Sequence, residues 1–143
     1  MAPKMHIDTS RWAAKLLSVQ REFTDGLETA VKKGSDVLVK ETVKNVSGEL
    51  HQYGTPSPSP GELPVSRITS MLKQSITRVM VGKDAAVIYP DETKAPYAKY
   101  VHDGTRVMKP RRYLSEAIRA KKEEIIDTIK DEVISRIRRH GLS

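Results

Sequence analysis

Apolar residues recur at steps of three or four along the first third of the chain, which is the spacing of one face of an α-helix. The clearest run is Trp12, Leu16, Val19 and Phe23. The pattern predicts helix over residues 9–46. A Thr-Asp-Gly triplet at 24–26 contains a poor helix former and could begin a second helix, so the pattern allows one helix or two in line.

The middle of the chain changes to turn residues and short apolar runs. Residues 54–64 hold four prolines, which remove four backbone donors and favour extended conformations, so they predict a loop. This Pro-rich loop fits an arm that orders on a partner and a surface insertion equally well. Beyond it, Ser66 is expected to cap a short helix with Ile68, Met71 and Leu72 facing inward.

Two runs rich in valine and isoleucine, 76–81 and 85–89, flank the turn residues Gly82-Lys83-Asp84 and predict a β-hairpin. Residues 110–140 repeat apolar residues at helical spacing and predict a long last helix. Its expected apolar stripe is Ile118, Ile125, Ile129, Val133 and Ile137, widened by Ile126 and Ile134. The predicted fold is one α+β domain over residues 1–143, with a small antiparallel sheet packed against the first and last helices.

A short helix with a glycine stop is predicted between the hairpin and the last helix. Pro96 suits a first helical position, because its missing N–H would have no partner there. Tyr97, Tyr100 and Val101 follow at a spacing that places them on one face of a single turn. Gly104 is expected to take the left-handed conformation that ends many helices.

We call residues 97–114 the corner, and their pattern is familiar. They read Tyr-Ala-x-x-Val-x-x-Gly-Thr-x-x-Met, then Arg-x-Tyr-Leu-x-x-Ala running on to residue 117. This pattern resembles the neck and tail-completion (head–tail connector) family of tailed bacteriophages. The matching residues are Tyr97, Ala98, Val101, Gly104, Thr105, Met108, Arg111, Leu114 and Ala117, with Tyr113 in place of a phenylalanine. The departures are His102, Asp103, Arg112 and Glu116.

The resemblance implies a structural virion protein that forms a ring in the phage neck, as a tail-completion or tail-terminator protein. The implied partners are copies of itself, with a hexamer as the expected ring, a head-completion or connector protein, and a tail-tube or tail-terminator protein. Genome DNA would pass through the ring without specific binding. The implied location is the virion, after assembly in the host cytoplasm.

The corner also supplies the candidate site residues. Residues expected to pack in the core are Tyr97, Tyr100, Val101 and Leu114. Basic residues expected at a subunit or partner interface are Arg106, Lys109, Arg111 and Arg112. The remaining motif residues, with structural roles, are Gly104, Thr105, Met108 and Tyr113.

Charge changes this picture only by adding an alternative. The chain has 25 Lys and Arg against 18 Asp and Glu, a net charge of +7. Such a charge would suit a small basic nucleic-acid-binding protein, which is the alternative function. The acids are interspersed with the bases, however, and this pattern is more typical of solvated helix faces.

Candidate chemistry is sparse. The chain has no cysteine, and its four histidines lack metal-ligand spacing. His102-Asp103 is the one adjacent histidine and carboxylate, and no nucleophile is indicated with it. No phosphate loop, nucleophile elbow or run of about 20 apolar residues is present. The sequence therefore predicts no enzyme, no metal, no cofactor and no membrane span.

Overall fold

The computed structural model describes residues 10–52, 55, 61–65, 67 and 69–139. Within them the elements are α1 (Ser10–Asn45), α2 (Met71–Ser75), β1 (Ile76–Val81), β2 (Ala85–Pro90), α3 (Ala98–Asp103) and α4 (Tyr113–Arg139). This order confirms the predicted α+β class, with two long helices and a hairpin between them in sequence.

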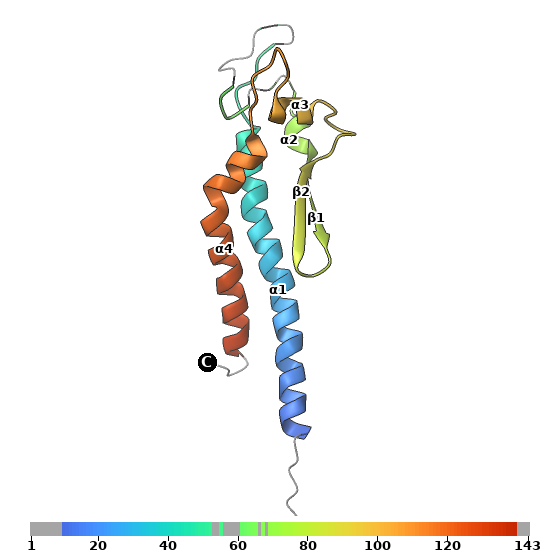
Figure 1. The fold of residues 1–143 in the computed structure, drawn as a ribbon, viewed down its shortest axis with the longest axis vertical. Coiled ribbons are helices and arrows are strands. Elements are labelled where there is room, and N and C mark those ends of the chain that lie inside the picture. The colour runs from blue at the N-terminus through green and yellow to red at the C-terminus, as the bar shows by residue number, and fades with distance from the viewer. Residues whose placement is uncertain (1–9, 53–54, 56–60, 66, 68, 140–143) are drawn as a thin grey trace, which may run out of the picture.

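The central element is α1, as Figure 1 shows: α4 lies along one side of it and the hairpin along another. The short helices α2 and α3 gather with the loops at the end where α1 finishes. The sequence predicted a sheet packed on both long helices, but the contacts of the hairpin run to α1. The two-stranded hairpin is narrow and packs on one side of α1, whereas α4 packs on another side, so α1 lies between them.

Two glycines inside α1 explain how α4 approaches it. A Cβ on Gly26 would lie 2.9 Å from Cδ of Arg136, and one on Gly34 would lie 2.9 Å from Cγ1 of Ile129. With Ala30, which is fully buried, they form a strip of small residues at every fourth position. Each glycine costs a helix about 1 kcal/mol relative to alanine. Close packing of α4 offsets that cost, so α1 is one continuous helix rather than two.

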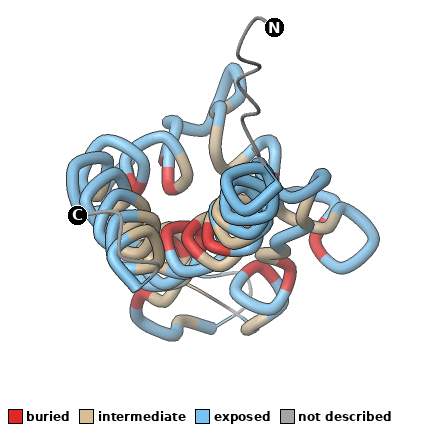
Figure 2. Tube along the Cα trace, turned by 90° about the horizontal axis from the view of Figure 1, so that it is seen from below, coloured by how far each residue is buried: buried red, intermediate tan, exposed pale blue. Residues whose placement is uncertain are grey.

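The first turns of α1 are left uncovered. Trp12 is 68% exposed and Leu16 is 64% exposed, and Leu17 and Phe23 are exposed as well. Figure 1 shows this part of α1 extending beyond the last turn of α4 and beyond the hairpin turn. In Figure 2 a row of buried positions lies between the two long helices. The predicted apolar stripe therefore has the right period, but only its later part is packed.

The core lies at the other end of α1. Its buried members are Val46, Val65, Leu72, Ala95, Ala98 and Tyr113, with Leu63, Ile76, Val101 and Leu114 packed against them. Eight hydrophobic residues are buried among those described, and four of the eight are alanines. Since large buried side chains supply most hydrophobic stabilisation, this core is small for the length of the chain.

The hairpin is as predicted, one residue longer at its end. Its strands pair antiparallel with Ile76 opposite Pro90 and Val81 opposite Ala85. Gly82 in the turn has φ of +71°, which suits a tight hairpin turn. Arg78 ties the hairpin to α1 by donating to Oγ of Ser35 (3.2 Å), and it also forms an ion pair with Asp36.

Other predicted boundaries need correction. Ser66 and Ile68 lie outside the described residues, and the short helix begins at Met71, after Ser70. Leu72 is buried as expected, but Met71 is exposed, because adjacent helical residues cannot face the same side. Most of the Pro-rich loop also lies outside the described residues.

The last helix begins at Tyr113, three residues later than predicted. The N–H of Arg111 donates to O of Val101 (2.9 Å), and the N–H of Tyr113 donates to O of Arg111 (2.8 Å). These bonds tie the residues before α4 to α3, so the helical pattern cannot start at Pro110. The stripe of α4 faces α1 through Ile125 and Ile129.

Candidate subunit interface at the corner

Tyr113 anchors the corner to the core. Its side chain is 1% exposed, and Oη donates a hydrogen bond of 2.9 Å to O of Ala98. Nδ2 of Asn45 donates to O of Tyr113 (2.9 Å), which joins the end of α1 to the start of α4. Burial disfavours the phenolate, so the pKa of Tyr113 is raised to about 12. The motif aromatic is therefore a core residue.

Gly104 makes the chain reversal possible. Its N–H donates to O of Tyr100 (2.8 Å), its φ is +77° and its ψ is 172°. The positive φ confirms the expected role of a glycine, but the ψ differs from that of a left-handed helical residue. This region of backbone conformation is essentially restricted to glycine. A Cβ here would also lie 2.8 Å from N of Pro110 and 2.9 Å from O of Met108.

The loop after Gly104 is a compact turn closed by Thr105. The N–H of Thr105 donates to O of Met108 (2.9 Å), and the N–H of Met108 donates to Oγ1 of Thr105 (3.1 Å). Val107 at the tip is 95% exposed, and Arg106 beside it is exposed. The turn thus holds an apolar side chain and a cation out toward solvent on a fixed backbone.

Arg111 corrects one predicted interface residue. It is only 7% exposed, and burial lowers the pKa of its guanidinium, an effect that the nearby Glu62 carboxylate opposes. The residue is held in the loop end of the fold by its backbone bond to Val101. A buried cation cannot reach a partner, so Arg111 is structural. Arg106, Lys109 and Arg112 are exposed, as an interface role requires.

Two predicted core residues lie on the surface instead. Tyr97 is exposed and Tyr100 is 55% exposed, whereas Val101 is half-buried. The face of α3 that meets the core carries Ala98, whose small side chain leaves room for the Tyr113 ring. The predicted inward direction therefore holds for Val101 and is wrong for Tyr97 and Tyr100.

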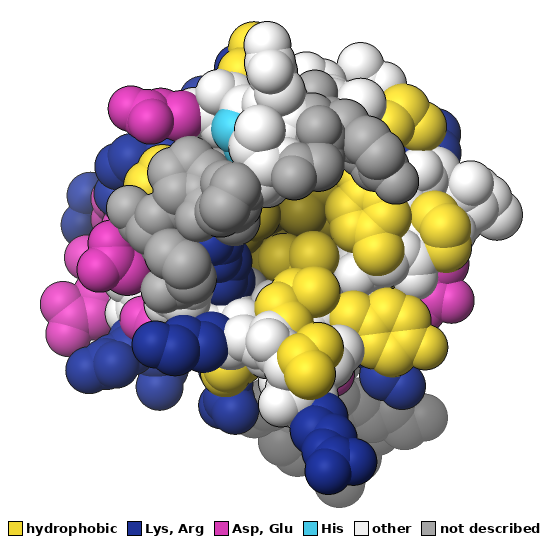
Figure 3. Space-filling view, turned by 90° about the horizontal axis from the view of Figure 1, so that it is seen from above, with side chains coloured by type: hydrophobic (Ala, Val, Ile, Leu, Met, Phe, Trp, Pro, Cys, Tyr) yellow, Lys and Arg dark blue, Asp and Glu magenta, His cyan; other side chains and the backbone are white. Residues whose placement is uncertain are grey.

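Leu114 is half-buried against the core, as predicted, and Met108 is exposed. Figure 3 looks onto this end of the molecule and shows hydrophobic side chains gathered there, with Lys and Arg side chains at their edges. The described hydrophobic residues exposed in the corner are Tyr97, Tyr100, Val107 and Met108. A mixed apolar and cationic surface of this kind is typical of protein interfaces.

Sequence reasoning missed Ser115, which the fold brings to His102. Nδ1 of His102 lies 2.8 Å from Oδ1 of Asp103, and Nε2 lies 3.2 Å from Oγ of Ser115. The hydrogen bond from His102 lowers the pKa of the Asp103 carboxyl. A serine, a histidine and an aspartate in this order resemble a catalytic triad. No local pattern pointed to Ser115, because only the fold brings the start of α4 beside α3.

The first turn of α4 argues for a helix cap instead. The N–H of Ser115 also points at Nε2 of His102 (3.4 Å), and the N–H of Glu116 donates to O of Arg112 (2.9 Å). The N–H of Tyr113 donates to O of Arg111. His102 thus accepts a hydrogen bond at the start of α4, where the amides lack partners within the helix, and this is an ordinary structural task.

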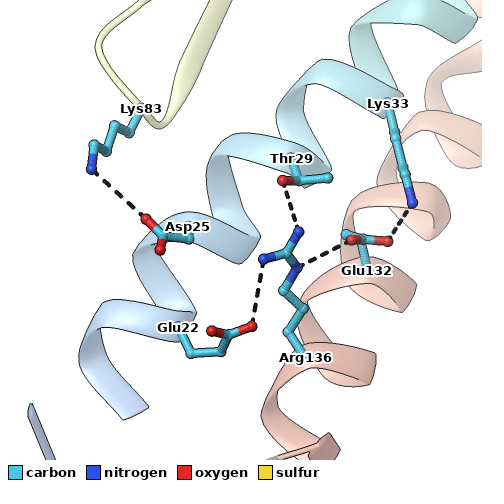
Figure 4. A network of polar contacts seen from close by, with 7 residues as sticks. All are labelled: Glu22, Asp25, Thr29, Lys33, Lys83, Glu132 and Arg136. Atoms are coloured by element: carbon cyan, nitrogen blue, oxygen red, sulfur yellow. Dashed lines mark hydrogen bonds and ion pairs between the residues drawn. The ribbon is translucent and has the colours of Figure 1, made fainter. Parts of the chain in front are cut away.

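A second polar cluster lies far from the corner, between α1 and α4 (Figure 4). Arg136 donates to Oγ1 of Thr29 (3.0 Å) and pairs with Glu22 and Glu132. Lys33 lies 2.7 Å from Oε2 of Glu132, and this contact is the main reason why the pKa of Glu132 is lowered. The network holds α4 against α1 through Arg136, one of the three arginines in the last turn of α4.

Among the described residues, no group of three or more His, Asp or Glu side chains is placed to hold a metal ion. No described helix has both the length and the apolarity that crossing a membrane requires. Comparison of the chain with protein-family models, with curated proteins and with solved structures gave no match. The likeness of the corner to the phage neck family is therefore a likeness of one motif.

Proposed function

We propose that this chain is a structural subunit of the neck of a tailed phage, where copies form a ring that joins the head connector to the tail. The observation that carries the proposal is the corner. It combines the motif shared with the neck family with exposed tyrosines and cations on a rigidly held turn. A rigid, mixed apolar and charged surface suits binding to another protein more than it suits chemistry.

The small core supports the same proposal. Exposed large hydrophobic residues occur on the described parts of α1, on both strands and in the corner, where Trp12, Val87 and Tyr100 are examples. Where such residues gather in one patch, as at the corner end in Figure 3, they mark a surface that a partner covers. The implied partners are copies of the chain, a head-completion or connector protein, and a tail-tube or tail-terminator protein.

The proposal is tested by charge reversal in the corner. Arg106→Glu combined with Arg112→Glu should leave the chain folded and abolish ring formation, measured by native mass spectrometry and negative-stain microscopy. Arg111 is left intact, because reversing a buried cation would unfold the corner. Arg119→Glu is the matched control, since Arg119 is an arginine on α4 whose side chain is 82% exposed.

The same samples test the alternative, a basic nucleic-acid-binding protein. Phosphate binding releases counterions, so its affinity falls steeply with salt. A gel shift with duplex DNA over a salt series should show only weak binding at physiological salt. Tight binding by the wild-type chain, together with normal rings in the double variant, would replace the neck proposal with the alternative.

A further inference from the structure

We propose that the first turns of α1, residues 10–23, dock on the outer face of α4 in a second copy of the chain. The inference rests on the proposed ring and names the contact that would close it. We call residues 10–23 the tip of α1. Three features support the contact: the uncovered stripe of the tip, the charge of the tip, and a surface of opposite charge on α4.

The tip carries the continuation of a packing face. Gly26 faces α4, because a Cβ there would meet the Arg136 side chain. Val19 and Trp12 precede Gly26 by seven and fourteen residues, so two and four helical turns place them on nearly the same face. Trp12 and Leu16 are more than 60% exposed. The face that packs on α4 further along α1, where Glu22 still pairs with Arg136, therefore has no cover at Trp12 and Leu16 among the described residues.

Charge decides what could cover it. Residues 10–23 contain three cations, Arg11, Lys15 and Arg21, and one acid, which gives +2; the acid, Glu22, already pairs with Arg136. These cations are exposed and join no ion pair in the described part of the chain. The first turn of α1 lacks an acidic residue, so the positive end of the helix dipole adds to the field. Two tips packed on each other would bring like charges together, which opposes a symmetric tip-to-tip dimer.

The outer face of α4 has the complementary character. Residues 123–131 contain four acids and one base, which gives −3. Glu123, Asp127 and Asp131 recur every fourth residue, are exposed, and join no ion pair among the described residues. Ile126 and Ile134 are exposed on the same helix, eight residues or about 12 Å apart. That spacing is close to the seven residues, about 10 Å, that separate Trp12 from Val19.

The contact joins two different patches, so it is heterologous. Each copy that docks its own tip still offers its α4 face to another copy, and the contact therefore propagates until the arrangement closes into a ring. Opposite charges would steer the encounter and set which patch meets which, while the apolar residues supply the burial. Assembly through this contact should weaken as salt concentration rises.

A mixing experiment tests the contact. One variant carries Arg11→Gln and Lys15→Gln and has a defective tip; the other carries Asp127→Asn and Asp131→Asn and has a defective α4 face. The substitutions remove charge without reversing it, so that the two defective patches do not attract each other. Each variant alone should stay monomeric in native mass spectrometry, with a dissociation constant raised about tenfold or more. Mixed in equal amounts, they should form dimers and stop, because one good tip meets one good face. Lys40→Gln, also exposed on α1, is the matched control and should assemble normally.

The single tryptophan reports the same event. Trp12 is the only tryptophan of the chain, so its emission should shift to shorter wavelength when rings form and when the two variants are mixed. Rings that survive both sets of substitutions would overturn the tip contact, while rings lost in the Arg106→Glu/Arg112→Glu variant would keep the neck proposal. A wild-type chain that stays monomeric at high concentration would overturn both. Dimers in the defective-face variant alone would favour tip-to-tip pairing and overturn the inference.

Discussion

The two ends of α1 carry similar apolar spacing and have opposite fates. At its C-terminal end, Val46 just beyond the helix is 1% exposed in the core with Tyr113. At its N-terminal end, Trp12 and Leu16 stand in solvent. Helical propensity does not separate the two ends, because both are helix. The difference lies in neighbours: several elements converge on one end, and none of the described elements reaches the other.

This comparison teaches how to read an amphipathic stripe. A periodic pattern tells which face of a helix prefers cover, and it does not tell whether the same chain supplies that cover. Substitutions at the Val46 end should therefore change the free energy of unfolding, and substitutions at the tip should change assembly.

Gly104→Ala should give the largest loss, about 3 kcal/mol of unfolding free energy in chemical denaturation. The new Cβ combines a strained positive φ with close contact to backbone atoms of Pro110 and Met108. Gly82→Ala is the matched control, because its φ of +71° is similar and its Cβ would meet only Oδ1 of Asp84 at 3.6 Å. The control should cost about 1 kcal/mol. Equal losses at both sites would show that the corner is not tightly packed.

Raising the pH above 10 should lower the stability of the core around Tyr113, and this is the second largest effect expected. The pKa of Tyr113 is raised to about 12 in the folded chain and is about 10 when unfolded. Its contribution is fully present below pH 10, and it is lost as pH rises toward 12, because the unfolded chain releases the proton first. Two pKa units correspond to about 3 kcal/mol. Tyr113→Phe should lack this decline in unfolding experiments, and a decline that persists would place its cause elsewhere.

Ile129→Ala should cost about 2 kcal/mol, since Ile129 packs over Gly34 and its loss opens the seam between the long helices. Ile134→Ala, on an exposed part of the same helix, should change stability by less than about 0.5 kcal/mol in dilute solution. Thermal melts of the two variants give the comparison. Similar melting temperatures for both variants would mean that α4 is not held to α1 as described.

Trp12→Ala should have the smallest effect on the stability of the single chain, within about 0.5 kcal/mol, because its side chain is already exposed. The same substitution should reduce assembly in native mass spectrometry. Val46→Ala is its counterpart at the buried end and should cost stability instead. A large loss of stability in Trp12→Ala would show that the tip folds onto its own chain, which breaks the comparison.

Much of the fold followed from local pattern. The period of the apolar residues predicted both long helices, and turn chemistry at Gly82 predicted the hairpin. The positive φ of Gly104 was also predictable, because a short helix had to stop before a chain reversal. These features depend on near neighbours in sequence, which is why they can be read from it.

Which particular side chains are buried could not be predicted from the local sequence pattern. Tyr97 and Tyr113 are both motif aromatics, yet only Tyr113 enters the core, because it is the one that faces Ala98 across the fold. Arg111 and Arg112 are neighbouring arginines in the sequence, yet Arg111 is buried and Arg112 is exposed. The backbone N–H of Arg111 donates to O of Val101, which holds Arg111 against α3. Contacts between α3 and the start of α4 decide these outcomes, and no local pattern encodes them.

The continuity of α1 also makes the tip a lever. Ser10 lies 12 residues before Glu22, which pairs with Arg136 of α4, so the free arm is about 18 Å long. A tilt of about 10° just before Glu22 would carry the end of the arm through roughly 3 Å without disturbing the distant core. Copies built this way could follow small changes in the diameter of a circular assembly by bending at one point, while the corner keeps its shape.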